Sequence, residues 1–404
     1  MPQYLTPGVY VEEVPSAIKP IAGVGTSTAG FAGVVADDVG MPLRPGRTGT
    51  TADGKPNPAD RYPVAPAGVA QLVDGWETFK NLFGDIQPGN QILAHAVYGF
   101  FNNGGGRCWV TRVAPATGKA EPSAPDDGFV AALDTFAAID EIALVAIPGA
   151  VSDRVQGAVL DHCANEYRQD RFAILDGRRT TTLTKAAIQG GTPDNSYGAI
   201  YYPWIDVGAR DADGKVVYQP PSGHIAGVYA RVDTERGVHK APANEVIRGA
   251  LGVETLVSKQ GQAGLNPVDI NVIRQFDGNV TIWGAHTLAG EENAEWRYIS
   301  TRRLVSFLRE SIDQGTQWVV FEPNAPELWS KIRRNVGAFL TTVWASGALL
   351  GNTPEQAFYV LCDERNNTQP IRDLGQLVVE VGVAIVRPAE FVVFRISQWA
   401  GGVQ

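Results

Sequence analysis

The chain has 404 residues, of which 44% are hydrophobic and 19% charged, as expected of a folded globular protein long enough for two or three domains. Its net charge of −9 argues against general nucleic-acid binding and against attachment to an anionic membrane surface. No apolar run approaches the roughly 20 residues needed to span a bilayer, and the N-terminus lacks the basic and then apolar pattern of a signal peptide.

The N-terminal region combines a strand-like stretch, a linker and a long loop. Tyr4–Val14 has a strand-like pattern, and the proline-bracketed Pro15–Pro20 forms the linker. Residues 26–35 predict a buried strand, whereas the prolines and glycines of residues 36–68 predict an exposed excursion. Beyond it, the patterns predict helices over 76–83 and 91–101 and a strand over 107–113.

The middle of the chain alternates between helical and strand patterns. We expect helices over 129–139, 153–167, 184–190 and 224–235, and strands over 142–148, 172–176, 196–206, 271–275 and 281–284. Because strands that alternate with helices form crossover units, this region predicts an α/β domain with a mostly parallel sheet.

The last third of the chain predicts two long helices. The first spans residues 291–314. The second begins at a capping-box pair, Asn324 and Glu327, and continues to about Leu350, where Gly351 closes it. Its apolar stripe consists of Leu328, Ile332, Val336, Phe339, Val343 and Leu350. A strand over 357–363 follows.

The chain ends in two strand patterns separated by a rigid joint. Leu377–Arg387 has apolar residues at every second position, and Glu390–Gln398 is a second apolar strand. The joint, Arg387-Pro388-Ala389, has no residue that readily takes the positive φ of a tight hairpin turn, and proline favours an extended path. The second strand therefore needs another sheet edge, which lies either in its own chain or in a neighbouring molecule.

The sequence contains no motif that carries chemistry. It lacks a Walker loop, a zinc-protease HExxH and a GxSxG motif. The five histidines lack ligand spacing. Cys108, Cys163 and Cys362 are far apart and lack metal or redox spacing, which predicts buried thiols in a chain folded in the cytoplasm. We therefore predict no catalytic residues, no cofactor and no metal site.

Several blocks of the sequence are long and distinctive. In order, they are Pro7–Glu13 with Gly23–Thr28, Phe100–Val113, Pro220–Ala243, Leu265-Asn266, Trp296–Ile312, Phe321–Gly351 and Val379–Trp399. Together they resemble the contractile tail sheath proteins of phages and of phage-like contractile injection systems. The resemblance covers most of the chain, although the excursion at 36–68 is not one of the matching blocks.

This resemblance implies a structural subunit, not an enzyme. Such subunits polymerise around an inner tube and contract to drive the tube through a target envelope. The implied partners are other copies of the chain, in stacked hexameric rings, together with the inner tube protein and baseplate and cap proteins. No direct binding of nucleic acid and no membrane insertion are expected. Assembly is expected in the bacterial cytoplasm, as part of a phage tail or a phage-tail-like particle.

The resemblance also implies a domain organisation of the α/β (α+β) class. A mixed-sheet outer domain spans residues 23–287, with the excursion at 36–68. An inner core domain of two long helices and a small sheet spans 288–387. The N-terminal arm and linker occupy residues 1–22, and a C-terminal arm strand occupies 388–404.

The implied functional residues fall into three groups. Intersubunit strands are Val9, Tyr10, Val11, Glu12 and Glu13 in the N-terminal arm, and Phe391, Val392, Val393, Phe394 and Ile396 in the C-terminal arm. The acceptor strand contains Val379, Val381, Val383 and Ile385. The tube-facing residues are Lys331, Arg333 and Arg334 on the second long helix, although the alternative for this basic cluster is an ordinary solvated helix face.

Two other functional classes stay open on the sequence. One is a non-contracting baseplate or cap component built on the same fold. The other is an enzyme with a site formed only in the folded chain, because α/β domains host many activities.

Overall fold

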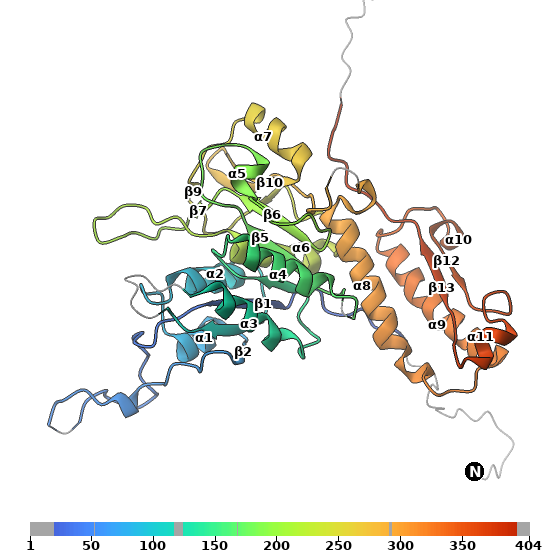
Figure 1. Cartoon of the computed structure of the whole chain (residues 1–404), viewed down its shortest axis with the longest axis horizontal. Coiled ribbons are helices and arrows are strands. Elements are labelled where there is room, and N and C mark those ends of the chain that lie inside the picture. The colour runs from blue at the N-terminus through green and yellow to red at the C-terminus, as the bar shows by residue number, and fades with distance from the viewer. Residues whose placement is uncertain (1–19, 52, 117–123, 168, 291–292, 394–404) are drawn as a thin grey trace, which may run out of the picture. The chain divides into compact units, whose positions relative to one another are not determined.

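The computed structural model describes residues 20–51, 53–116, 124–167, 169–290 and 293–393. These residues form two compact units. Unit 1 contains the described residues up to Gly23 and Glu310–Ile385, and unit 2 contains Val24–Arg309 and the segment that begins at Val386 (Figure 1). The predicted domain division, 23–287 against 288–387, stays a prediction, and the two units meet along the chain inside one long helix, at residues 309 and 310.

Unit 2 is built on a nine-stranded mixed sheet, which confirms the predicted fold class. Its strand order is β2-β3-β1-β4-β5-β6-β10-β11-β8, and the six neighbours from β3 to β10 run parallel. The strands are β1 (Ala29–Val34), β2 (Ala70–Val73), β3 (Cys108–Val113), β4 (Leu144–Ala146), β5 (Phe172–Asp176), β6 (Gly198–Tyr202), β8 (Glu245–Val246), β10 (Ile270–Phe276) and β11 (Asn279–Ile282). A separate ribbon pairs β7 (Ile205–Asp206) with β9 (Gly252–Val253).

Helices cover this sheet and create two hydrophobic cores. They are α1 (Trp76–Phe83), α2 (Gln91–Asn102), α3 (Asp126–Phe136), α4 (Asp153–Ala164), α5 (Lys185–Ile188), α6 (Ser222–Arg236) and α7 (Lys259–Leu265). Because successive strand residues point to opposite faces, Phe31 joins the core with α1, α2 and α6, whereas Ala32 joins the core with α3 and α4. Helix α6 lies against α2 with little space between them, since a Cβ atom on Gly227 would stand 2.4 Å from the carbonyl oxygen of Phe100.

Unit 1 contains the end of α8 (Ile299–Thr316), the helices α9 (Pro326–Ala345), α10 (Pro354–Ala357) and α11 (Gln369–Asp373), and a ribbon of β12 (Phe358–Leu361) and β13 (Glu380–Val383). Helix α9 packs on β12. Five residues of the predicted apolar stripe, from Leu328 to Val343, are buried, whereas Leu350 lies beyond the helix and is exposed. Short 3-10 turns occur at Pro58–Asp60 and Asn266–Val268 in unit 2, at Gln317–Val319 in unit 1, and at Ala294–Trp296 just before α8.

Three predictions about the long helices are wrong in detail. Helix α8 begins at Ile299, eight residues after the predicted start at 291, because a 3-10 turn and a loop precede it. Helix α9 ends at Ala345, where Gly347 takes a φ of 84°, instead of continuing to Leu350. The capping box does not form: Ala325 is the N-cap residue, and the Asn324 side chain accepts a hydrogen bond from the Trp329 indole (2.8 Å).

The excursion at 36–68 is mostly exposed, as predicted, and extends away from the sheet in Figure 1. Its two limbs are joined by isolated bridges from Leu43 to Arg61 and from Thr50 to Pro56. Asp60 is buried within it and accepts a hydrogen bond from the Gly49 amide (3.2 Å). The excursion is therefore a loop whose two limbs are held together by its own contacts, and these contacts do not indicate a role.

Candidate assembly site

Unit 1 carries a sheet of only two strands. Strands β12 and β13 pair antiparallel, with Phe358 opposite Val383 and Leu361 opposite Glu380. Leu349 forms an isolated bridge with Ile385 just beyond β13. Within the described part of the chain no third strand joins this sheet. Helix α9 supports the ribbon through β12, and the edge of a strand has N–H and C=O groups on which a further strand can pair.

The predicted acceptor residues all lie in or beside β13. Val381 and Val383 are within the strand, Val379 precedes it, and Ile385 follows it. All four side chains are only partly buried in the single chain. Their role as the acceptor of a strand from another subunit stays a prediction.

The segment after the joint exposes three consecutive apolar side chains. Phe391, Val392 and Val393 are 77%, 68% and 76% exposed, and none of them belongs to a strand. Phe394 and Ile396, the other predicted donors, lie outside the described residues, as do Val9–Glu13 of the N-terminal arm. Three exposed apolar residues in a row lose contact with water only when they meet another surface.

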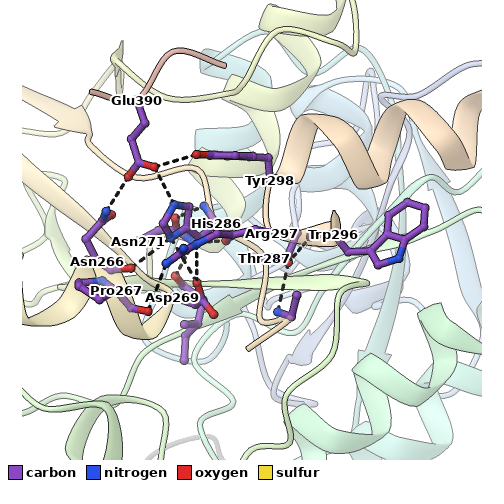
Figure 2. A network of polar contacts seen from close by, with 12 residues as sticks. Asn266, Pro267, Asp269, Asn271, His286, Thr287, Trp296, Arg297, Tyr298 and Glu390 are labelled. Atoms are coloured by element: carbon purple, nitrogen blue, oxygen red, sulfur yellow. Dashed lines mark hydrogen bonds and ion pairs between the residues drawn. The ribbon is translucent and has the colours of Figure 1, made fainter. Parts of the chain in front are cut away.

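The residue just before these three is anchored to unit 2. The Glu390 carboxylate accepts hydrogen bonds from the Asn266 side-chain amide (2.5 Å) and the Tyr298 hydroxyl (3.0 Å), and lies 3.1 Å from Nε2 of His286 (Figure 2). Burial raises the pKa of Glu390, but the Asn266 hydrogen bond and the charge on His286 outweigh it and hold the pKa below its ordinary value. The exposed segment therefore starts from a fixed point at Glu390.

His286 is the buried centre of this anchor. Its side chain is 1% exposed, and its Nδ1 lies 3.2 Å from the Asp269 carboxylate and 3.1 Å from the carbonyl oxygen of Asn266 (Figure 2). Burial lowers the pKa of His286, but the hydrogen bond to Asp269 and the charge of Glu390 outweigh it and leave the pKa above its ordinary value. A charged imidazolium therefore suits this position.

A second buried network connects Thr26, near the start of unit 2, with Asp233 in α6 and Arg303 in α8. Arg303 donates to both carboxylate oxygens of Asp233, at 2.8 and 2.5 Å, and to the carbonyl oxygen of Thr26 (3.0 Å). The Thr26 hydroxyl donates to the same carboxylate (2.6 Å). Both charged side chains are at most 5% exposed. The pair therefore connects Thr26, just before β1, to helices α6 and α8.

We expect Arg303→Met to lower the free energy of unfolding by about 3–5 kcal/mol, because it leaves the Asp233 charge buried without a positively charged partner. Arg309→Met, on the exposed side of the same helix, is the matched control and should cost less than about 1 kcal/mol. Urea unfolding of both variants measures the difference. Equal stability of the two would show that the pair contributes little.

The predicted tube-facing residues do not share one environment. Arg333 donates to the carbonyl oxygen of Cys362 (2.6 Å) and borders a pocket of about 380 Å³ together with Trp329, Asp363 and Arg365. Lys331 and Arg334 are exposed, and their side chains form no ion pair or hydrogen bond with another residue that the structure describes. Of the three predicted residues, Lys331 and Arg334 are therefore the two whose charges no described residue pairs, and whether they meet a tube stays a prediction.

The described ranges contain no cluster of three or more His, Cys, Asp or Glu side chains that could hold a metal ion. The three cysteines are buried thiols, as predicted. None of the helices in these ranges is both long and apolar enough to cross a membrane.

The anchor around Glu390 has no pattern in the sequence that predicts it. Its members come from the 3-10 turn at Asn266–Val268, from Asp269, His286 and Tyr298, and from the C-terminal segment, and Asn266 and Glu390 are 124 residues apart. Contacts of this kind follow no spacing rule. The one available signal was the polar Glu390 at the start of an otherwise apolar segment.

The sequence matches two models of one family. Residues 126–288 match the phage tail sheath protein central domain, and residues 291–398 match the phage tail sheath C-terminal domain. A protein of Pseudomonas aeruginosa (strain UCBPP-PA14), described as a prophage major tail sheath protein, is 25% identical over 268 residues. That match spans 63% of this chain and 65% of the relative, slightly less than two thirds of its length.

Two solved structures of the anti-feeding prophage match almost the whole chain at 30% identity. One is the helical sheath in its contracted state, with a TM-score of 0.74, and the other is the baseplate, with a TM-score of 0.72. In both cases the match covers 98% of this chain and 99% of the other. The family models, the sequence relative and the structures agree with the resemblance noted in the sequence: the chain belongs to the phage tail sheath protein family.

Proposed function

We propose that this chain polymerises around an inner tube into a contractile sheath, and that its C-terminal arm pairs with the two-stranded sheet of another copy. The observation that carries the proposal is the combination of an incomplete sheet, β12–β13, with an exposed apolar segment, Phe391–Val393. An extended segment that joins a sheet edge gains main-chain hydrogen bonds and buries alternate side chains. In a sheath of such subunits, this pairing links each subunit to a neighbour through the β12–β13 sheet of unit 1.

The energies suit an assembly that does mechanical work without a nucleotide. Fully burying one of the three exposed apolar side chains stabilises the docked arm by about 1.5–3 kcal/mol. The gain at one arm is therefore modest, but it is repeated at every subunit of the polymer. Free energy stored at these interfaces during assembly is released on contraction. It takes the place of nucleotide hydrolysis, for which the sequence has no phosphate-binding loop.

The tube contact is assigned to the free cations of α9, Lys331 and Arg334. A sheath must hold its tube in register and release it on contraction, so weak and salt-sensitive contacts suit it. Exposed ion pairs contribute about 0–1 kcal/mol each and are screened by salt. Arg333, whose guanidinium is already bonded to Cys362, serves the fold of unit 1.

Reversing both free cations, Lys331→Glu with Arg334→Glu, should give sheath that is empty, contracted or unable to form on the tube. The unfolding free energy should change by less than about 0.5 kcal/mol, because both side chains are exposed. Negative-stain microscopy of sheath co-expressed with its tube protein measures the filled fraction. Arg333→Gln is the control: it should lower stability and leave the subunits that still fold able to fill. Normal tube-filled particles from the double reversal would place the tube elsewhere.

The remaining partners follow from this role. The subunit stacks as hexameric rings, is closed by baseplate and cap proteins, binds no nucleic acid directly and has no enzymatic activity. It is assembled in the bacterial cytoplasm, before the phage tail or tail-like particle leaves the cell. In this proposal residues 23–287 form the outer domain and residues 288–387 the inner domain.

A second candidate is a sheath-like subunit of the baseplate, which one of the matched anti-feeding prophage structures favours. Electron microscopy of the chain expressed with its tube partner separates the two functions. Long striated tubes identify the sheath subunit, a single short ring identifies the baseplate component, and a monomer with turnover contradicts both.

A further inference from the structure

The imidazole of His286 lies between two carboxylates from distant parts of the chain. Nδ1 faces Asp269, just before β10, at 3.2 Å, and Nε2 faces Glu390, at the base of the C-terminal arm, at 3.1 Å (Figure 2). A neutral imidazole has one N–H, so it can donate to only one of these two acceptors. Nδ1 also lies 3.1 Å from the carbonyl oxygen of Asn266, so both ring nitrogens face acceptors, and only the charged form carries an N–H on each.

The charges around the ring balance only when His286 is protonated. The groups that face it are the Asp269 and Glu390 carboxylates and the Tyr298 hydroxyl, with Arg297 Nε 3.7 Å from Asp269. Arg387, in the joint, also acts electrostatically on Tyr298. Two carboxylates, His286 and Arg297 sum to zero with an imidazolium and to minus one with a neutral ring. In a buried site the second state is costly.

We propose that His286 and Glu390 form a proton-controlled anchor that fixes the point from which the C-terminal arm leaves its own subunit. With the imidazolium present, Glu390 is held on unit 2 and the arm starts at Phe391. Loss of the proton removes the positive charge beside Glu390 and leaves one N–H for two acceptors, so the arm base is held only by the hydrogen bonds from Asn266 and Tyr298 and is released more often. This inference rests on the proposed function for its consequence, which is control of the length of arm available to a neighbour.

The direction of the pH dependence follows from the two pKa shifts. The pKa of His286 is raised in the anchored state, so its contribution is complete below the ordinary value near 6.5 and is lost as the pH rises through the raised pKa. The pKa of Glu390 is lowered, so its contribution is present above its ordinary value and is lost as the pH falls through the lowered pKa. The anchor is therefore strongest in mildly acidic solution and is released on the alkaline side.

The test uses the unassembled full chain with a spin label at Val393→Cys, a position that is exposed, while the three native thiols are buried. Electron paramagnetic resonance measures the mobile fraction of the label from about pH 6 to about pH 9. We expect the ratio of mobile to tethered label to rise with pH, by up to about tenfold for each unit by which the pKa of His286 is raised. An unchanged mobile fraction across this range would overturn the proposal.

Two variants separate the effect of the charge on His286 from the effect of the hydrogen bonds to Glu390. In Glu390→Gln, the side-chain amide can donate to a neutral His286 and still accept from Asn266, so the label should stay tethered at high pH. In Tyr298→Phe, one uncharged hydrogen bond is lost and both carboxylates remain, so the label should be more mobile at every pH and keep the transition. A transition that persists unchanged in Glu390→Gln would assign it to another group. Because the measurement uses single subunits, it is independent of whether the chain forms sheath.

Discussion

Deleting Phe391–Gln404 should leave a folded subunit that does not form sheath. The three deleted residues that the structure describes are exposed, so they contribute little to the fold of the single chain. We expect the free energy of unfolding to change by less than about 0.5 kcal/mol. In contrast, the assembled state loses an apolar strand at each subunit. Calorimetry of the subunit and electron microscopy of the assembly measure the two effects.

A point variant sharpens this test. Val393→Asp places a charge in the proposed strand, whereas Leu256→Asp places the same charge at an equally exposed apolar position of unit 2, 76% exposed in both cases. Only Val393→Asp should abolish polymers. Normal polymerisation of the truncated chain, or its global unfolding, would be inconsistent with strand donation.

Inserting about three Gly or Ser residues between Glu390 and Phe391 should allow assembly and block contraction. The insertion adds up to about 10 Å of flexible chain between the anchor and the donated strand, so a movement of one subunit no longer pulls its neighbour. Contraction triggered by mild denaturant and observed by electron microscopy measures the effect. The fraction of extended tubes that contract should fall from nearly all to nearly none.

The matched control inserts the same residues between Arg387 and Pro388, before the anchor. If Glu390 fixes the start of the arm, this slack stays within the subunit and contraction should be affected less. Tubes with the first insertion that contract as fully as the parent would show that the arm does not transmit motion.

The sequence predicts the interior of unit 2 well because burial and local pattern act together there. Helix α1 and strand β5 have the predicted bounds, 76–83 and 172–176, since apolar spacing, a terminating Gly84 and a fully buried strand leave few alternatives. The parallel sheet follows from the alternation of such elements.

Errors occur where tertiary contacts compete with local signals. Asn324 has the right type for a helix cap, but its side chain binds the Trp329 indole and its amide donates to the carbonyl oxygen of Gln376. Arg333 has the right charge for a docking face, and the sequence does not show that its guanidinium donates to the carbonyl oxygen of Cys362; its predicted role stays a prediction. The sequence shows that these groups can bond and cannot show which partner they meet.

For the candidate site too, some parts follow from local sequence patterns and others depend on the tertiary structure. The strand β13 and the apolar segment after the joint could be predicted, because period-two apolar residues and a proline joint are local features, whereas the acceptor role of β13 stays a prediction. The anchor at Glu390 could not, because its strength comes from the burial of His286 between two carboxylates brought together by the fold. Burial of this kind is a property of the tertiary structure.

The most direct measurement is a cryo-electron microscopy reconstruction of the polymer formed by the full chain on its tube. We expect Phe391–Ile396 to form a strand on the edge of the β12–β13 sheet of a neighbouring subunit, with Glu390 on His286 of its own subunit. A reconstruction in which that strand pairs with a sheet of its own subunit, or in which another element occupies the β12–β13 edge, would contradict it.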